Sequence, residues 1–162
     1  MKIYLLRHGI AEAASYQAND AKRELTDEGR AGIALVGRAL RSLGVAPHPI
    51  LASPLARAQQ TAAIVAAELK LKAAPVQSEA LVPWTPFAQA RTLLAEYAAE
   101  EQIMVVGHEP HLSGLAMELC GGGTGALKLK KGGLCRIDID DPAATGALVW
   151  LLTPKLLAEL GR

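Results

Sequence analysis

Leu6-Arg7-His8-Gly9 is the stretch that decides how the rest of the chain is interpreted. An uncharged apolar run, residues 3–6, leads into it and stops at a cation, an imidazole and a glycine. A buried strand that ends in this way delivers two reactive side chains to the carboxyl edge of a sheet, where open α/β folds bind their ligands. Taken alone, the stretch is more typical of a strand that ends in a polar turn.

Further apolar runs alternate with helical patterns along the chain. Strands are predicted at residues 50–52, weakly at 74–76, at 103–106, and as an antiparallel pair at 134–139 and 147–152. Helices are predicted between them, with Thr26, Ser53 and Thr153 as N-caps. Alternating strands and helices favour a mostly parallel sheet covered on both faces. We therefore expect one α/β domain over residues 1–162, a three-layer α/β/α sandwich with antiparallel strands near the C-terminus.

Composition excludes several classes of partner. The 162 residues include 17 Lys and Arg against 16 Asp and Glu, which gives a net charge of +1. Such a balance provides no broad basic field for nucleic acid or an anionic membrane. No apolar stretch reaches the roughly 18 residues of a membrane helix, and no signal segment precedes the first strand. Cys120 and Cys135 are interpreted as reduced core residues, so a cytoplasmic protein is expected.

Two arginines and two histidines are expected to meet at one edge of the predicted sheet. Arg7 and His8 end the first strand, Arg57 lies one turn into the helix after the second, and His108 follows the third. Like charges gathered at one point repel unless an anion binds there, and arginine forks match phosphoryl oxygens. Neighbouring arginines lower the pKa of an imidazole, so His8 is expected to be a neutral nucleophile that attacks phosphorus.

These residues resemble the motifs of the histidine phosphatase superfamily, the phosphoglycerate mutase-like proteins, and within it the SixA-type protein phosphohistidine phosphatases. The resemblance covers essentially the whole chain, including the late Lys131-Gly132-Gly133 and Leu152-Thr153-Pro154 segments. Its motifs are Leu6-Arg7-His8-Gly9, Leu25-Thr26 with Gly29, Ser53-Pro54-Leu55-Ala56-Arg57-Ala58-Gln59-Gln60-Thr61, and Val106-Gly107-His108-Glu109-Pro110.

The resemblance implies a metal-independent phosphatase without a cofactor. It assigns the nucleophile to His8 and phosphate binding to Arg7, Arg57 and His108, and it suggests that Asp20 and Arg23 face the substrate. The implied substrate is a protein phosphorylated on histidine, for example a histidine-containing phosphotransfer domain. Two alternatives stay open: a phosphatase of small phosphorylated metabolites, and a phosphate-binding regulatory module without turnover.

The general acid is where the chain departs from the family pattern. Mutases and many small-molecule phosphatases of the superfamily carry a glutamate in a distinctive loop. Here only Glu79 stands in the corresponding region, and Glu109 beside His108 is the other candidate. A weak acid suits a good leaving group such as imidazole, whose pKa is far below that of an alcohol.

Structural roles are expected for most of the other histidines, aromatic residues and lysines that stand out in the sequence. His48 is expected in a surface loop. His111 is expected as a capping or exposed residue, with a place at the rim of the site near His108 as the alternative. Trp84 borders the pocket or packs beneath its loop. The lysines at 128, 130 and 131 alternate with leucines, which predicts a strand edge with a basic face. The histidines lack metal-ligand spacing, and the arginines would oppose a cation.

Overall fold

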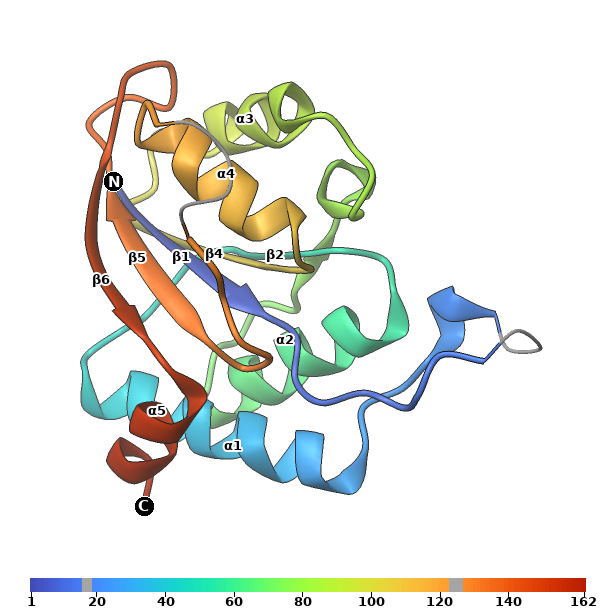
Figure 1. Cartoon of the computed structure of the whole chain (residues 1–162). Coiled ribbons are helices and arrows are strands. Elements are labelled where there is room, and N and C mark those ends of the chain that lie inside the picture. Colours follow the sequence, from blue (N-terminus) through green and yellow to red (C-terminus); the bar gives the residue numbers. More distant parts are fainter. Residues whose placement is uncertain (16–18, 123–126) are drawn as a thin grey trace.

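A computed structural model describes residues 1–15, 19–122 and 127–162 of the chain. Its centre is a six-stranded sheet (Figure 1) in the order β3-β2-β4-β1-β5-β6. The strands are β1 (Lys2–Arg7), β2 (Ile50–Ala52), β3 (Val76–Gln77), β4 (Gln102–Gly107), β5 (Leu134–Asp138) and β6 (Ala147–Leu152). The first four in sheet order run parallel, and β5 is antiparallel to both β1 and β6.

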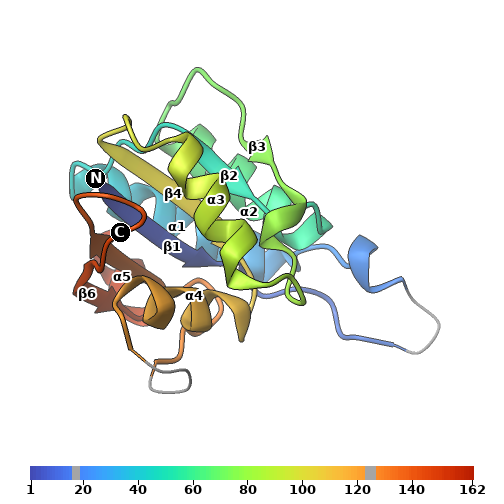
Figure 2. The same cartoon turned by 90° about the horizontal axis from the view of Figure 1, so that it is seen from above.

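Helices cover both faces of the sheet, which confirms the expected three-layer α/β/α class. Figures 1 and 2 show α1, α2 and α5 on one face, and α3 and α4 on the other. The helices are α1 (Asp27–Ser42), α2 (Ala56–Glu68), α3 (Phe87–Glu96), α4 (His111–Leu119) and α5 (Pro154–Leu160), with short 3₁₀ turns η1 (Asp20–Lys22) and η2 (Glu79–Leu81). Within the described residues, no helix combines the length and apolar character needed to cross a bilayer.

Side-chain alternation along β1 explains why the sheet is buried on both faces. Tyr4 and Leu6 belong to the apolar cluster beneath α1, α2 and α5, whereas Ile3 and Leu5 belong to the cluster beneath α3 and α4. All four are almost fully buried. A strand covered on both sides needs an uninterrupted apolar run, and this is why residues 3–6 carry no charge.

The parallel register places the ends of the central strands side by side. Arg7 pairs with Gly107 at the ends of β1 and β4, and Ala52 pairs with Val106. The carboxyl ends of β1, β2 and β4 therefore meet at one edge of the sheet. This edge is where open α/β sheets bind their ligands.

Three local predictions need correction. Ser53 does not cap a helix that starts at Pro54, because α2 begins at Ala56 and Leu55 is its N-cap. Residues 127–130 form no strand, although the expected alternation is present: Leu129 is buried and the lysines at 128, 130 and 131 are exposed. His111 is neither exposed nor a cap: the first turn of α4 packs it inward, and it keeps only 3% of its accessible surface.

Candidate active site

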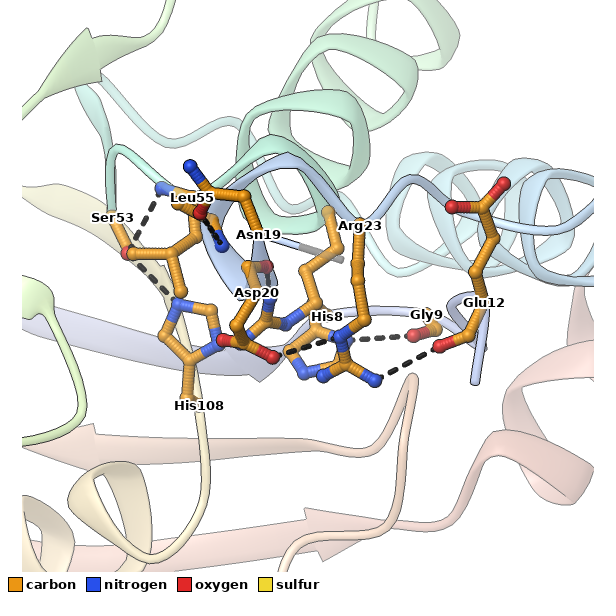
Figure 3. Close-up of polar contacts among 11 residues, drawn as sticks. His8, Gly9, Glu12, Asn19, Asp20, Arg23, Ser53, Leu55 and His108 are labelled. Carbon is orange, nitrogen blue, oxygen red and sulfur yellow. Dashed lines mark hydrogen bonds and ion pairs between the residues drawn. The ribbon is translucent and has the colours of Figure 1, made fainter. Parts of the chain in front are cut away.

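His8 and His108 lie at the adjoining ends of β1 and β4. Their ring centroids are 5.1 Å apart, and both side chains are at least 95% buried. Arg57, in the first turn of α2, is 96% buried, and Arg7 is half-buried at the end of β1. The four residues singled out from the sequence are thus brought to one edge of the sheet, as Figure 3 shows for the two histidines.

The tautomer of His8 is fixed by its own backbone. Nδ1 lies 2.7 Å from the carbonyl oxygen of Gly9, which can only accept a hydrogen bond (Figure 3). Nδ1 must therefore carry the proton, and in the neutral ring the lone pair is on Nε2. Burial is the main reason why the pKa of His8 falls to about 4, with smaller contributions from Arg57, Arg7 and Lys131. The direction agrees with the sequence-based expectation, but the principal cause is burial rather than the arginines.

His108 is held by Ser53, the residue that the sequence suggested as a helix cap. Nε2 of His108 lies 2.8 Å from Ser53 Oγ (Figure 3), and Ser53 Oγ also accepts a bond from the backbone N–H of Leu55. The hydroxyl proton is then free to point at Nε2, and in the tautomer that accepts it Nδ1 of His108 carries the ring proton. Burial, followed by the charges of His8 and Arg57, lowers the pKa of His108 to about 2. A neutral His108 can donate from Nδ1.

Three buried donors around these histidines have no acceptor among the described residues. They are Nδ1 of His108, Nε of Arg7 and Nε of Arg57. A buried donor without a partner costs about 1–3 kcal/mol, more when it is charged, and such atoms are rare in native proteins. An oxyanion placed among them would satisfy several at once, and a tetrahedral phosphoryl group has the required number of oxygens.

Asp20 and Arg23 are brought to the site, where Asp20 contacts Arg57 and Arg23 contacts Asp20. Arg57 donates from Nη1 to the Asp20 carbonyl at 2.9 Å and from Nη2 to its carboxylate at 3.1 Å. Arg23 forms a second ion pair with the same carboxylate at 2.8 Å. The two arginines lower the pKa of Asp20, against the opposing effect of its desolvation. Asp20 is therefore an ionised partner of Arg57 at the rim.

The two candidate general acids differ in their surroundings. Glu79 is exposed and begins η2, just beyond the end of β3, at the sheet edge that carries the histidines. Both carboxylate oxygens of Glu109 bind Ser113, one at the backbone N–H and one at the hydroxyl, at 3.2 and 2.7 Å. Glu109 therefore stabilises the first turn of α4. A role in proton transfer stays a prediction for both residues.

Several supporting contacts could not be read from the sequence. Leu129 offers its carbonyl to Nη1 of Arg7 at 2.9 Å, and the N–H of Gly132 lies 3.1 Å from the carbonyls of both Arg7 and His8. Thr61 accepts a bond from the N–H of Gly9 at 3.1 Å. Thr61 and Gly132 belonged to quoted motifs and segments, but no local pattern shows which distant backbone group a loop carbonyl or N–H will meet.

Residues 129–133 form a strap across the end of β1. Besides the bonds above, the N–H of Arg7 donates to the carbonyl of Gly133 at 3.0 Å, and the N–H of Gly133 donates to the carbonyl of Lys130 at 2.6 Å. The strap thus fixes the backbone of Arg7 and His8 and one terminal nitrogen of the Arg7 guanidinium.

The described part of the chain contains no cluster of three or more His, Cys, Asp or Glu residues that could hold a metal ion.

Sequence comparison places this chain in a known family. The model of the histidine phosphatase superfamily (branch 1) matches residues 3–82. An uncharacterised protein of Picosynechococcus is 38% identical over 137 residues, which cover 83% of this chain and 82% of that protein. The chain belongs to the histidine phosphatase superfamily.

Among its relatives is the phosphohistidine phosphatase SixA of Escherichia coli, 28% identical over 95% of this chain and 94% of that protein. A structure of the protein histidine phosphatase SixA complexed with tungstate has a TM-score of 0.89 at 26% identity, over 97% of this chain and 99% of that one. The α-ribazole phosphatase of Shigella flexneri shares the fold, with a TM-score of 0.77 at 21% identity over 95% and 97% of the two chains.

Proposed function

We propose that the protein hydrolyses phosphohistidine on a phosphorylated protein, through a phosphohistidine intermediate on His8. The observation that carries the proposal is the set of buried, unpaired donors around a neutral His8 whose Nε2 holds the lone pair. Membership of the superfamily supports phosphatase activity, and the likeness to SixA supports the substrate class. We place the reaction in the cytoplasm.

The chain's own residues suffice for both chemical steps. Nε2 of His8 attacks phosphorus in line, while Arg7, Arg57 and the Nδ1–H of His108 stabilise charge on the equatorial oxygens. The bond from phosphorus to the leaving imidazole breaks, and that imidazole departs with its electron pair and takes up a proton from solvent, which the attacking water gives back in the second step. Water then attacks the phosphoryl group on His8, which releases phosphate and restores the neutral ring.

The leaving group explains why this site works with a weak general acid. Free imidazole has a pKa near 6.5, so it departs with little help from a proton donor, whereas an alkoxide needs one. Glu109 is bonded to Ser113 and Glu79 is exposed, so neither is held ready as a buried proton donor to the leaving group. This favours phosphohistidine over an alkyl phosphate as the substrate.

The decisive experiment compares His8→Ala with the wild-type protein in the presence of a chelator. A histidine-containing phosphotransfer domain, phosphorylated by phosphoramidate, is the substrate. We expect hydrolysis to fall at least about 1,000-fold, with an unchanged circular dichroism spectrum. His48→Ala, an exposed histidine at the opposite edge of the sheet, is the matched control and should retain full rate.

The covalent intermediate gives an independent readout. After rapid alkaline quenching, mass spectrometry of the wild-type protein should show one phosphoryl group on the peptide that contains His8, and none in His8→Ala. Residual activity of His8→Ala within tenfold of wild type would refute the nucleophile assignment. Phosphate binding by the wild-type protein without hydrolysis would instead identify a regulatory module. Hydrolysis of small phosphomonoesters in preference to the phosphoprotein would favour the small-molecule alternative.

A further inference from the structure

A hollow lies beside the start of α4, just after His108 in the chain, and has no part in the proposed chemistry. It has a volume of about 450 Å³ and lies between the loop before α3 and the first turn of α4. We call it the Trp84 cavity. Its lining consists of Pro83, Trp84, Thr85, Pro86, Phe87, Pro110, His111, Ser113 and Gly114. Small-molecule sites in proteins have similar volumes, beginning at about 300 Å³, and are likewise mostly apolar with few polar groups.

His111 is the polar group that this cavity leaves unsatisfied. Its side chain is 97% buried, and neither ring nitrogen forms a hydrogen bond of accepted geometry with a described residue. Burial lowers its pKa, while the backbone of Thr85 lies close enough to raise it. The backbone of Thr85 can hydrogen-bond to one ring nitrogen at most, so the other nitrogen lacks a partner in either tautomer. Burying an imidazole nitrogen without a hydrogen-bond partner costs folding free energy, unless a bound group supplies that partner.

The walls of the cavity select for a flat ring. The ring of Phe87 lies 5.3 Å from that of His111, at an interplanar angle of 44°. Phe87 also packs over Gly114 so closely that a Cβ atom there would collide with it. Trp84 stands at the rim with 74% of its surface exposed, which is unusual for so large an apolar side chain. Aromatic and proline surfaces pack well against another aromatic plane.

We propose that the Trp84 cavity is a binding site for an aromatic group that carries one hydrogen-bonding atom, and that His111 binds that atom. The ring packs between Trp84 and Phe87, and its hydroxyl or N–H meets the unpaired nitrogen of His111. The site adjoins the phosphate pocket through the segment from His108 to His111. The aromatic group is either part of the phosphoryl donor or a separate small molecule, and both sources share this chemistry.

Phenol and toluene are the probes that isolate the hydrogen bond. The chain has two tryptophans, so Trp150→Phe leaves Trp84 as the only one and makes its fluorescence a report on the cavity. Excitation at the red edge of the tryptophan band avoids absorption by either probe. We expect saturable changes with both, and tighter binding of phenol. The absence of any saturable change with either probe overturns the proposal.

His111→Phe, made in the Trp150→Phe background, removes the hydrogen-bonding atom while keeping a ring in place. We expect the dissociation constant of phenol to rise about tenfold and that of toluene to change by less than twofold. An equal loss for the two probes refutes the role of His111. Trp84→Ala changes only an exposed side chain and should weaken the binding of both probes, as measured by calorimetry. Unaltered binding of both probes refutes the cavity assignment.

Two further measurements identify the source of the aromatic group. If it belongs to the phosphoryl donor, His111→Phe raises KM for 4-hydroxyphenyl phosphate, whose ring carries a free hydroxyl, and leaves hydrolysis of phosphoramidate unchanged. If it is a separate molecule, phenol binds equally well when inorganic phosphate fills the pocket, and His111→Phe leaves the kinetics with 4-hydroxyphenyl phosphate unaltered. The binding measurements do not depend on turnover, so they test the cavity even if the proposed phosphatase activity is absent.

Discussion

At the scale of single residues, the chemistry depends on which donors are already occupied. Arg57 uses both terminal nitrogens on Asp20 and keeps its buried Nε without a partner, whereas Arg7 gives one terminal nitrogen to Leu129. The two arginines are therefore not equivalent. Arg7 is oriented by neutral backbone, and Arg57 by a carboxylate that a bound phosphoryl group would approach.

Replacing Arg57 with alanine should remove a preorganised donor to the transition state. Loss of one such donor costs about 100- to 1,000-fold in rate, so we expect kcat/KM for phosphohistidine hydrolysis to fall in this range. Arg57→Lys should recover only part of the loss, because an ammonium cannot reproduce the fork geometry. If both variants changed thermal stability but not kcat/KM, Arg57 would be structural.

Asp20 should compete with phosphate for Arg57. Its carboxylate holds Arg57 at 3.1 Å and adds a negative charge at the rim of an anion site. We expect Asp20→Asn, which keeps a side-chain acceptor but removes the charge, to tighten the binding of inorganic phosphate about twofold to fivefold, the effect of a partly exposed charge pair. Isothermal titration at low and high salt measures this. Weaker binding in Asp20→Asn would show instead that the carboxylate mainly orients Arg57.

At the scale of elements, the strap of residues 129–133 positions the end of β1. Gly132 has a φ of +75°, in the left-handed region where an L side chain is strained, and its N–H reaches the carbonyls of Arg7 and His8. Gly44, after α1, has a similar φ of +68° and open space around it. The two glycines form a matched pair, one in the strap and one outside it.

Alanine at either glycine should cost about 1–2 kcal/mol of unfolding free energy, because both positions require positive φ. Only Gly132→Ala should also disturb catalysis, since it shifts the backbone that carries Arg7 and His8. We expect kcat/KM to fall about tenfold or more in Gly132→Ala and to change less than twofold in Gly44→Ala. Equal kinetics in the two variants would show that the strap does not position the site.

The sequence predicted the elements better than the contacts between them. Residues 3–6, 50–52 and 103–106 are uncharged runs, so their strands and their common edge followed from hydropathy and topology. Ser53 was assigned to a helix start because Ser-Pro is a local capping signal, yet its hydroxyl serves His108, 55 residues away. Similarly, nothing local separates a buried His111 from an exposed one. Such contacts depend on tertiary packing.

At the scale of the whole molecule, the buried histidines should make stability depend on pH. Burial holds the pKa of His8 near 4 and that of His108 near 2, against an ordinary value of 6.5. As pH falls below 6.5, the unfolded chain takes up protons at these positions while the folded chain does not. The unfolded state then binds more protons, and the free energy of unfolding must decrease.

Each histidine should contribute up to about 1.4 kcal/mol per pH unit between pH 6.5 and 4, as measured by urea unfolding. His108→Asn removes one titrating ring and should reduce the slope by about that amount, whereas His48→Asn should leave it unchanged. Saturating phosphate should also flatten the slope, since an anion between the rings favours their protonated forms. An equal slope in the wild-type protein and His108→Asn would mean that His108 is not held neutral by the fold.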